Sequence, residues 1–163
     1  MTVRDLQDSL VADLEKLFEH SRYKTPDGDL KKPNVFPQFL PKRMNEDDDD
    51  PFTYLIVRVD NGAIETPASA HKVATLILIG VFDDDAANSG HAAILEIMEK
   101  IQERYQKSTA LLGLDEKTIV AVLDRDSPMT WALQDEESYP YFFGGINITW
   151  DLAAPRQEAS DLT

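Results

Sequence analysis

The segment from Tyr141 to Leu152 alternates between apolar and polar side chains more regularly than any other part of the chain. The apolar side chains of one parity are Phe142, Ile146, Ile148, Trp150 and Leu152. Asn147, Thr149 and Asp151 occupy the other parity. Because successive side chains of a strand point to opposite faces, this pattern predicts a strand with one face buried and one face in water. The pair Gly144-Gly145 indicates a bulge or a close backbone contact within it.

A hairpin is expected to supply two further long strands. Residues 52–60 are rich in Tyr, Ile, Val and Leu, and residues 70–82 return as a second strand after a polar loop that begins at Asn61-Gly62. The run from Leu76 to Ile79 is continuously apolar, so we expect both faces of this strand to be covered, one by helices and one by a neighbour or another subunit. Shorter strands are expected at 118–123 and 129–134.

Two segments carry the periodicity of amphipathic helices. Residues 2–20 place leucines at helical spacing, and Thr2 with Asp5 three positions later resembles a capping box. Residues 86–107 carry a second apolar stripe, and Asn88 or Ser89 is a candidate N-cap. Strands joined by hairpins, with two helices to cover one face, predict an α+β fold: an antiparallel β-sheet flanked by two α-helices.

A proline-rich acidic segment separates the first helix from the hairpin. Five prolines fall within residues 24–51, so no regular element is expected to run through it, and we expect a long extended loop. It nevertheless contains Phe36 and Phe39, which predicts that part of it lies on the core or on a partner. We expect residues 1–155 to form a single domain that includes this loop, and residues 156–163 to form a polar C-terminal tail.

Charge excludes several classes of partner. The chain has 16 Lys and Arg against 30 Asp and Glu, a formal net charge of −14. Binding to nucleic acid requires a basic footprint, and docking on anionic membranes requires basic residues as well, so neither partner is expected. The longest nearly apolar run, Val73 to Phe82, is too short to span a bilayer.

No pattern of catalytic or metal-binding residues emerges. The chain has no cysteine, its three histidines lie far apart, and it lacks phosphate-binding and nucleophile-elbow motifs. The acidic runs Asp47–Asp50 and Asp83–Asp85 offer oxygen ligands but lack the ligand spacing of a calcium loop, which favours solvated loops. We therefore expect no catalytic residues, no bound metal and no cofactor. A metal-dependent hydrolase that uses the acidic loops is the alternative from a different class.

Interaction with other subunits is the remaining hypothesis. Aromatic residues are concentrated in the last third of the chain; Phe142 and Trp150 have the parity of the core, whereas Tyr141 and Phe143 have the opposite parity. The loop phenylalanines and the doubly apolar strand offer further contacts. The candidate interface residues are Phe36, Phe39, Leu76, Leu78, Tyr141 and Phe143.

The order of these elements resembles a known family. A strand at Phe52–Asp60, a strand at Val73–Asp83, a helix at Ile94–Tyr105 and above all the segment Tyr139–Trp150 are similar to the tail terminator (tail completion) proteins of long-tailed bacteriophages and prophages. The resemblance covers residues 1–152, and the segment 24–51 is its least clearly matched part. The family has no short functional motif, so no functional residue is transferred from it.

The resemblance implies a structural virion protein without enzymatic activity. Tail terminators form a ring, usually a hexamer, that caps the tail tube, stops its polymerisation and provides the surface for head–tail joining. The implied partners are other copies of the chain, the tail-tube protein and a head-completion or connector protein. The implied location is the head-proximal end of the tail in the virion, and the host cytoplasm during assembly. Another phage neck or tail component is the alternative within this class.

Overall fold

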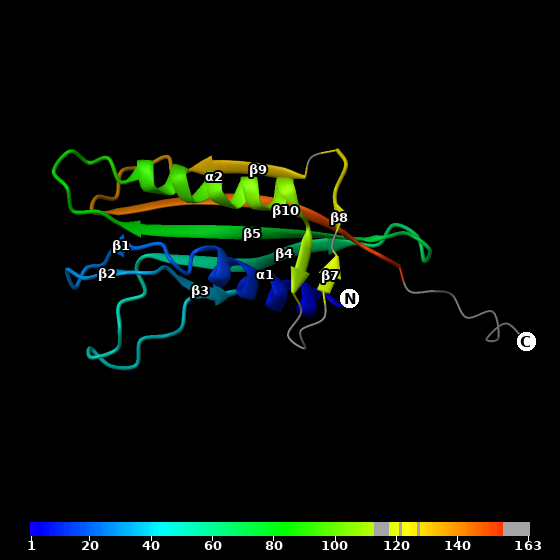
Figure 1. The fold of residues 1–163 in the computed structure, drawn as a ribbon, viewed down its shortest axis with the longest axis horizontal. Coiled ribbons are helices and arrows are strands. Elements are labelled where there is room, and N and C mark those ends of the chain that lie inside the picture. Colours follow the sequence, from blue (N-terminus) through cyan, green and yellow to red (C-terminus); the bar gives the residue numbers. More distant parts are fainter. Residues whose placement is uncertain (113–117, 121, 127, 155–163) are drawn as a thin grey trace, which may run out of the picture.

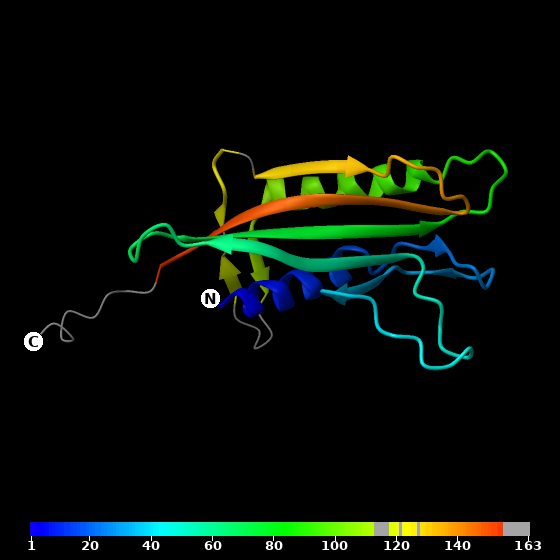
Figure 2. The same ribbon diagram turned by 180° about the vertical axis from the view of Figure 1, so that it is seen from behind.

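The computed structural model describes residues 1–112, 118–120, 122–126 and 128–154. Within these residues, two helices and ten strands follow one another (Figures 1 and 2). In chain order they are α1 (Val3–Leu17), β1 (Tyr23–Lys24), β2 (Leu30–Lys31), β3 (Asn34–Pro37), β4 (Tyr54–Ala63), β5 (His71–Phe82), α2 (His91–Lys107), β6 (Ala110–Leu112), β7 (Thr118–Val120), β8 (Val122–Leu123), β9 (Met129–Leu133) and β10 (Tyr141–Leu152).

A six-stranded sheet forms the body of the molecule. Its strands follow the order β3-β4-β5-β10, and both β8 and β9 pair with β10. All pairs are antiparallel except β3 with β4, which are parallel. The strands β3 and β9 therefore lie at opposite edges (Figure 1). The other short strands form two separate pairs, β1 with β2 and β6 with β7.

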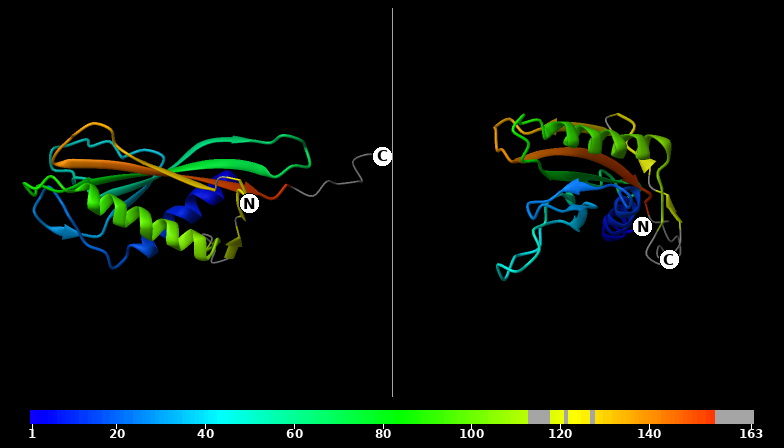
Figure 3. Two further views of the ribbon diagram at one scale, coloured as in Figure 1. Left: turned by 90° about the horizontal axis from the view of Figure 1, so that it is seen from above. Right: turned by 60° about the vertical axis from the view of Figure 1, so that its left-hand side comes forward.

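Both long helices cover the same face of the sheet (Figure 3, left). Helix α1 packs on β3 and β4, and α2 packs on β5 and β10. A salt bridge from Arg104 on α2 to Asp13 on α1, 2.9 Å long, joins the two helices. The α+β class predicted from the sequence is confirmed, and the sheet is antiparallel apart from its β3 edge.

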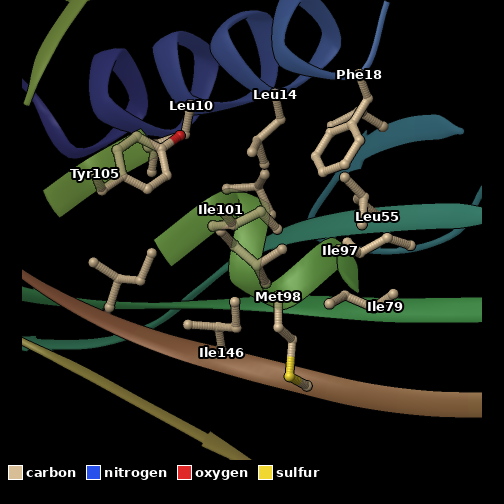
Figure 4. Close-up of a cluster of buried hydrophobic side chains, with 14 of the residues drawn as sticks. Leu10, Leu14, Phe18, Leu55, Ile79, Ile97, Met98, Ile101, Tyr105 and Ile146 are labelled. Atoms are coloured by element: carbon tan, nitrogen blue, oxygen red, sulfur yellow. The ribbon is translucent and has the colours of Figure 1, made fainter. Parts of the chain in front are cut away.

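The core fills the space between the helices and this face. Leucines of α1 meet α2 and the inward side chains of the strands (Figure 4). The fully buried large side chains are Trp150, Tyr105, Phe18, Leu6, Leu10, Leu14, Leu55, Ile77, Ile79, Ile94, Ile97 and Met98. Phe142 and Trp150 both lie in this core, as their parity predicted.

A buried hydroxyl links two strands inside the core. Thr75 donates a hydrogen bond to the carbonyl of Ile148 at 3.0 Å and accepts one from the indole N–H of Trp150 at 3.0 Å. The Trp150 ring meets Tyr105 edge to face, with centroids 5.5 Å apart. A buried indole N–H without a hydrogen-bond partner would lower the stability of the fold. Thr75 removes this cost, because it accepts a bond from the one polar side-chain atom that Trp150 brings into the core.

The start of α1 and the end of α2 agree with the sequence, whereas α1 ends at Leu17 rather than at residue 20 and α2 begins later than predicted. Thr2 caps α1, and Asp5 completes the predicted capping box, with bonds of 2.9 and 3.0 Å. Helix α2 begins at His91 rather than at residue 86, and its N-cap is Gly90, without a side-chain cap. The predicted caps Asn88 and Ser89 belong to the preceding turn.

The hairpin is longer than predicted. The pair Asn61-Gly62 was expected to open the loop, but these residues pair with Ala74 and Val73 inside the ladder of β4 and β5. The register shifts between Val59 and Asn61, so one extra residue is accommodated as a bulge and pairing then resumes. The tertiary partner strand thus overrides a strong local turn signal.

The proline-rich segment also contains regular structure. No regular element was expected to run through it, and none of the described strands does; within it, β3 extends the sheet, and β2 pairs with β1 in a short hairpin around Gly28, whose φ is 90°. Proline is compatible with β3 because this strand is a short edge, where a missing N–H breaks no bond of the ladder. The acidic residues 46–50 do lie in a loop.

The two adjacent glycines of β10 should respond differently to a methyl group. A Cβ atom on Gly144 would lie 2.6 Å from both Ile94 Cγ2 and Met98 Cε of α2, whereas one on Gly145 would lie at least 3.4 Å from any neighbour. We expect Gly144→Ala to lower the free energy of unfolding by about 1–3 kcal/mol through overpacking. The matched variant Gly145→Ala should change it much less. Urea unfolding of both variants measures this, and equal losses would contradict the close approach of α2 to β10.

Candidate functional site: the open face of the sheet

The second face of the sheet is covered by neither helix, and it carries most of the predicted interface residues. On β5 the odd residues from Val73 to Val81 point toward the helices and are buried, while most even residues are half-buried on the other side. Because β10 pairs with β5 in one continuous register, its even residues likewise face the helices and its odd residues face the other side. We call this second side, with its residues on β3, β4, β5 and β10, the open face.

An aromatic cluster occupies one end of the open face. Phe52 lies with its ring centroid 4.9 Å from Tyr54, 4.7 Å from Tyr141 and 6.1 Å from Phe143. Tyr54 lies flat on its neighbouring strand, since a Cβ on Gly80 would be only 2.4 Å from its ring. Desolvation of the hydroxyl raises the pKa of Tyr54. Phe143 remains 37% exposed at the outer side of this cluster.

Aliphatic side chains continue the apolar surface across the middle of the sheet. The register places Phe36 beside Ile56, and Ile56 beside Leu78. Leu76 and Leu78 are half-buried and lean toward Gly145, where a Cβ would lie 3.4 and 3.5 Å from their methyl groups. The absence of a side chain at position 145 therefore leaves these two leucines at the surface. We call the band from the aromatic cluster through these residues the apolar strip.

A basic residue bounds the apolar strip on β4. Arg58 donates from Nε to the carbonyl of Gln38 at 3.1 Å, and its guanidinium lies 4.9 Å from the ring centroid of Phe39. Phe39 itself is 65% exposed. A cation held over an aromatic ring in this way fixes the ring at the border of the strip.

Gln38 is the residue that positions this border, and sequence reasoning missed it. Its side chain accepts a bond from the N–H of Val59 and donates to the carbonyl of the same residue, each at 3.0 Å. Gln7 of α1 donates to the Gln38 amide oxygen at 2.9 Å. The side chain therefore imitates one more residue of β3 beside β4. No local pattern indicates this role, because its partners lie 21 and 31 positions away.

The structure brings the six predicted interface residues onto one side of the molecule. Five of them lie on the open face, from three different strands: Phe36, Leu76, Leu78, Tyr141 and Phe143. Phe39 lies at its border beside Arg58. The strand parity of Tyr141 and Phe143 is as predicted from the alternation.

The first acidic run is held by its own loop. Arg43 donates to the carbonyls of Glu46 and Asp48 and lies 3.8 Å from a carboxylate oxygen of Asp50. The Asp48 carboxylate accepts bonds from the N–H groups of Asn45 and Met44, which lower the pKa of Asp48. A pocket of about 320 Å³ lies between this loop and β3. These carboxylates serve turns and a guanidinium and do not converge on one point.

The second acidic run connects the end of β5 with β1 and with the start of β10. Lys24 lies 3.3 Å from Asp83 and 3.9 Å from Asp84, and the bond to Asp83 raises the pKa of Lys24. The N–H of Asp83 donates to the carbonyl of Pro140 at 2.9 Å. The Tyr139 hydroxyl donates to the carbonyl of Asp84. This run therefore joins three segments of the chain at one end of the sheet.

Comparisons with known proteins identify no family and no relative of this chain. Among the described residues, no group of three or more potential metal ligands lies close enough together to hold an ion. Neither described helix is long and apolar enough to cross a membrane.

Substitutions at two neighbouring residues of β5 should lower the free energy of unfolding by different amounts, because the two side chains lie on opposite faces of the sheet. Ile77 is fully buried beneath the helices, and Leu78 is half-buried on the open face. We expect Ile77→Ala to cost about 2–5 kcal/mol of unfolding free energy. Leu78→Ala should cost about 1 kcal/mol. Chemical unfolding monitored by circular dichroism compares them, and a loss at Leu78 as large as that at Ile77 would contradict an open face.

Proposed function

We propose that the chain is a structural assembly protein of a long-tailed phage or prophage, a tail terminator that works as a closed ring. In this proposal the ring caps the tail tube, stops its polymerisation and presents its far side to a head-completion or connector protein. Its place is the head-proximal end of the tail, and it has no enzymatic activity. The observation that carries the proposal is the apolar strip on a sheet face that neither helix covers.

The composition of the apolar strip supports contact with another subunit. Apolar and aromatic side chains from four strands form a continuous band, in which Phe143 is 37% exposed, and Phe39 at its border is 65% exposed. Large contiguous apolar patches on soluble proteins mark interaction sites. Aromatic anchors are typical of the residues that contribute most to binding energy. The surface therefore has the chemistry of an interface between protein subunits.

A ring requires one further property of this surface. In a cyclic ring each subunit uses two different patches, one to contact each neighbour, and the rotation between them must close. In this proposal the open face supplies one of these two patches. A patch that paired with its own copy would give a two-fold dimer and not a ring. We propose that the strip contacts a different surface of the next copy. A hexamer is the ring size that the family resemblance implies.

Charge gives the proposal a second line of support. At a net charge of −14, free subunits repel one another and DNA alike. An acidic channel lets DNA pass without binding to the wall, so the charge is compatible with a ring through which DNA travels. The charge therefore supports a subunit that does not bind nucleic acid.

The proposal predicts ring formation and capping that depend on the apolar strip. Purified chain should form a ring by native mass spectrometry and negative-stain microscopy, alone or on tubes polymerised from the tail-tube protein of the same genome. Leu78→Lys should abolish the ring, because it places a charge in the middle of the strip. Ile64→Lys, which changes a 59% exposed apolar residue of the hairpin loop, is the matched control and should assemble normally.

Three outcomes would contradict the proposal. Tubes that keep growing when the chain is present would exclude a terminator. Incorporation of the chain along the whole tube would instead identify a tube component. A folded Leu78→Lys variant that forms rings as well as the unmodified chain would exclude the strip as the ring contact.

A further inference from the structure

The two edges of the sheet are built differently. At the β3 edge, the N–H of Asn34 donates to Thr53, just before β4, and that of Gln38 donates to Val57 of β4, so Val35 and Pro37 present their backbone outward. Pro37 has no N–H, and β3 is only four residues long. Short strands and prolines are the usual protection of a sheet edge against pairing with another chain. The β3 edge is therefore protected.

The β9 edge carries no such protection. Its five residues, Met129–Leu133, contain no proline and no charge, and their register with β10 is continuous. Among the strands that the structure describes, only β10 pairs with β9. An uncharged, unbulged edge in a chain of net charge −14 is an exception that requires an explanation.

The hydrogen-bond pattern shows which backbone groups this edge offers. The N–H of Gln134 donates to Phe143 at 3.1 Å, and the carbonyl of Pro128 accepts from Thr149 at 3.0 Å. Because bonding alternates along an antiparallel strand, the even residues of β9 bond to β10 and the odd residues point outward. Met129, Trp131 and Leu133 therefore present their N–H and C=O groups to whatever lies beside the edge.

The side chains of the same three residues are apolar. Their register opposite Ile148, Ile146 and Gly144 places them on the side of the sheet that the helices cover. Met129 and Leu133 are partly buried against the core, but Trp131 is 56% exposed. A tryptophan in this position has its neighbours on one side only, which is the arrangement expected where a further strand is added.

We propose that β9 is a docking edge for a second copy of the chain, whose own β9 adds to it antiparallel about a two-fold axis at Trp131. In this pairing Trp131 lies opposite the same residue of the partner, and Met129 lies opposite Leu133. All outward N–H and C=O groups of the three residues are then satisfied, and the cross-strand pairs that these three residues form are apolar. The two sheets become one, with the helices of both copies on the same side.

A second copy fits this edge better than a charged partner. No acidic residue lies between Met129 and Leu133, so two strongly negative chains can meet there without placing like charges opposite one another. The self-pairing also needs no strand other than one that the chain already has. The β3 edge cannot serve instead, because Pro37 leaves it short of donors.

This inference is independent of the proposed function. A two-fold pair uses the same patch twice, whereas a cyclic ring uses two different patches, so the two assemblies rest on different surfaces. Leu78→Lys tests the ring contact on the open face and leaves β9 unchanged. Failure of one proposal therefore does not decide the other.

The experiment measures self-association of the full chain by analytical ultracentrifugation over a wide range of concentration. We expect self-association to include a reversible dimer, whose population rises with salt because salt screens the net charge. Trp131→Lys should raise the dissociation constant of the dimer about tenfold or more, because two like charges then face each other at the axis. Ile64→Lys is the control, since it makes the same change at a residue of similar exposure far from β9, and should leave the constant unchanged.

A disulfide test locates the axis. The chain has no cysteine, so Trp131→Cys introduces the only thiol. Residues directly opposite in a bonded antiparallel pair have Cα atoms about 5.5 Å apart, within the range that a disulfide spans. Mild oxidation should therefore link two copies of Trp131→Cys, and Ile64→Cys should link far less.

The result can overturn the proposal in three ways. One is a chain that stays monomeric at every concentration. The second is a dimer unaffected by Trp131→Lys, with the variant shown to be folded by circular dichroism. The third is disulfide formation in Trp131→Cys no faster than in Ile64→Cys. If the chain is monomeric alone but loses binding to tail tubes on Trp131→Lys, the edge takes a strand from a different protein and the second copy is excluded.

Discussion

The uninterrupted pairing of β5 with β10 is the constraint on which the rest of the structure depends. Both strands are twelve residues long and pair along their whole length without a bulge. Because the side-chain period of a strand is two, this single register decides for both strands which residues meet the helices and which face outward. A slip by one residue would move Trp150 out of the core and the open-face side chains into it. The separation of core and candidate interface is thus a consequence of one ladder.

Patterns within a single element were predictable from the sequence, and relations between elements were not. The bounds of β10 and the sides taken by Phe142 and Phe143 follow from alternation, which is a local property. That Phe36 lies beside Ile56, and Ile56 beside Leu78, depends on the pairing of strands distant in sequence, which no local pattern specifies. The same limit explains why Gln38, whose partners lie on β4 and α1, was missed.

At two places the structure departs from the local sequence signal, and in each a tertiary contact outweighs that signal. Asn61-Gly62 is a strong turn sequence, yet pairing with β5 draws it into the ladder after a bulge. The N-cap of helix α2 is Gly90, not one of the better capping residues Asn88 or Ser89. A Cβ on Gly90 would lie 2.2 Å from the Phe142 ring, so the chain enters the helix at a point where only a glycine fits against β10. Both cases show β5 and β10 imposing their geometry on the segments around them.

The position of the charge bears on how copies can approach one another. The acidic segments 46–50, 83–85 and 135–137 hold eleven of the thirty acidic residues and lie at the end of the sheet where β5 ends and β10 begins (Figure 1). The apolar strip has no acidic residue, and neither does β9. The surfaces proposed for contact therefore add no acidic side chain of their own to the repulsion between copies. In a ring whose subunits all face the same way, the three acidic segments of every copy would lie on the same rim.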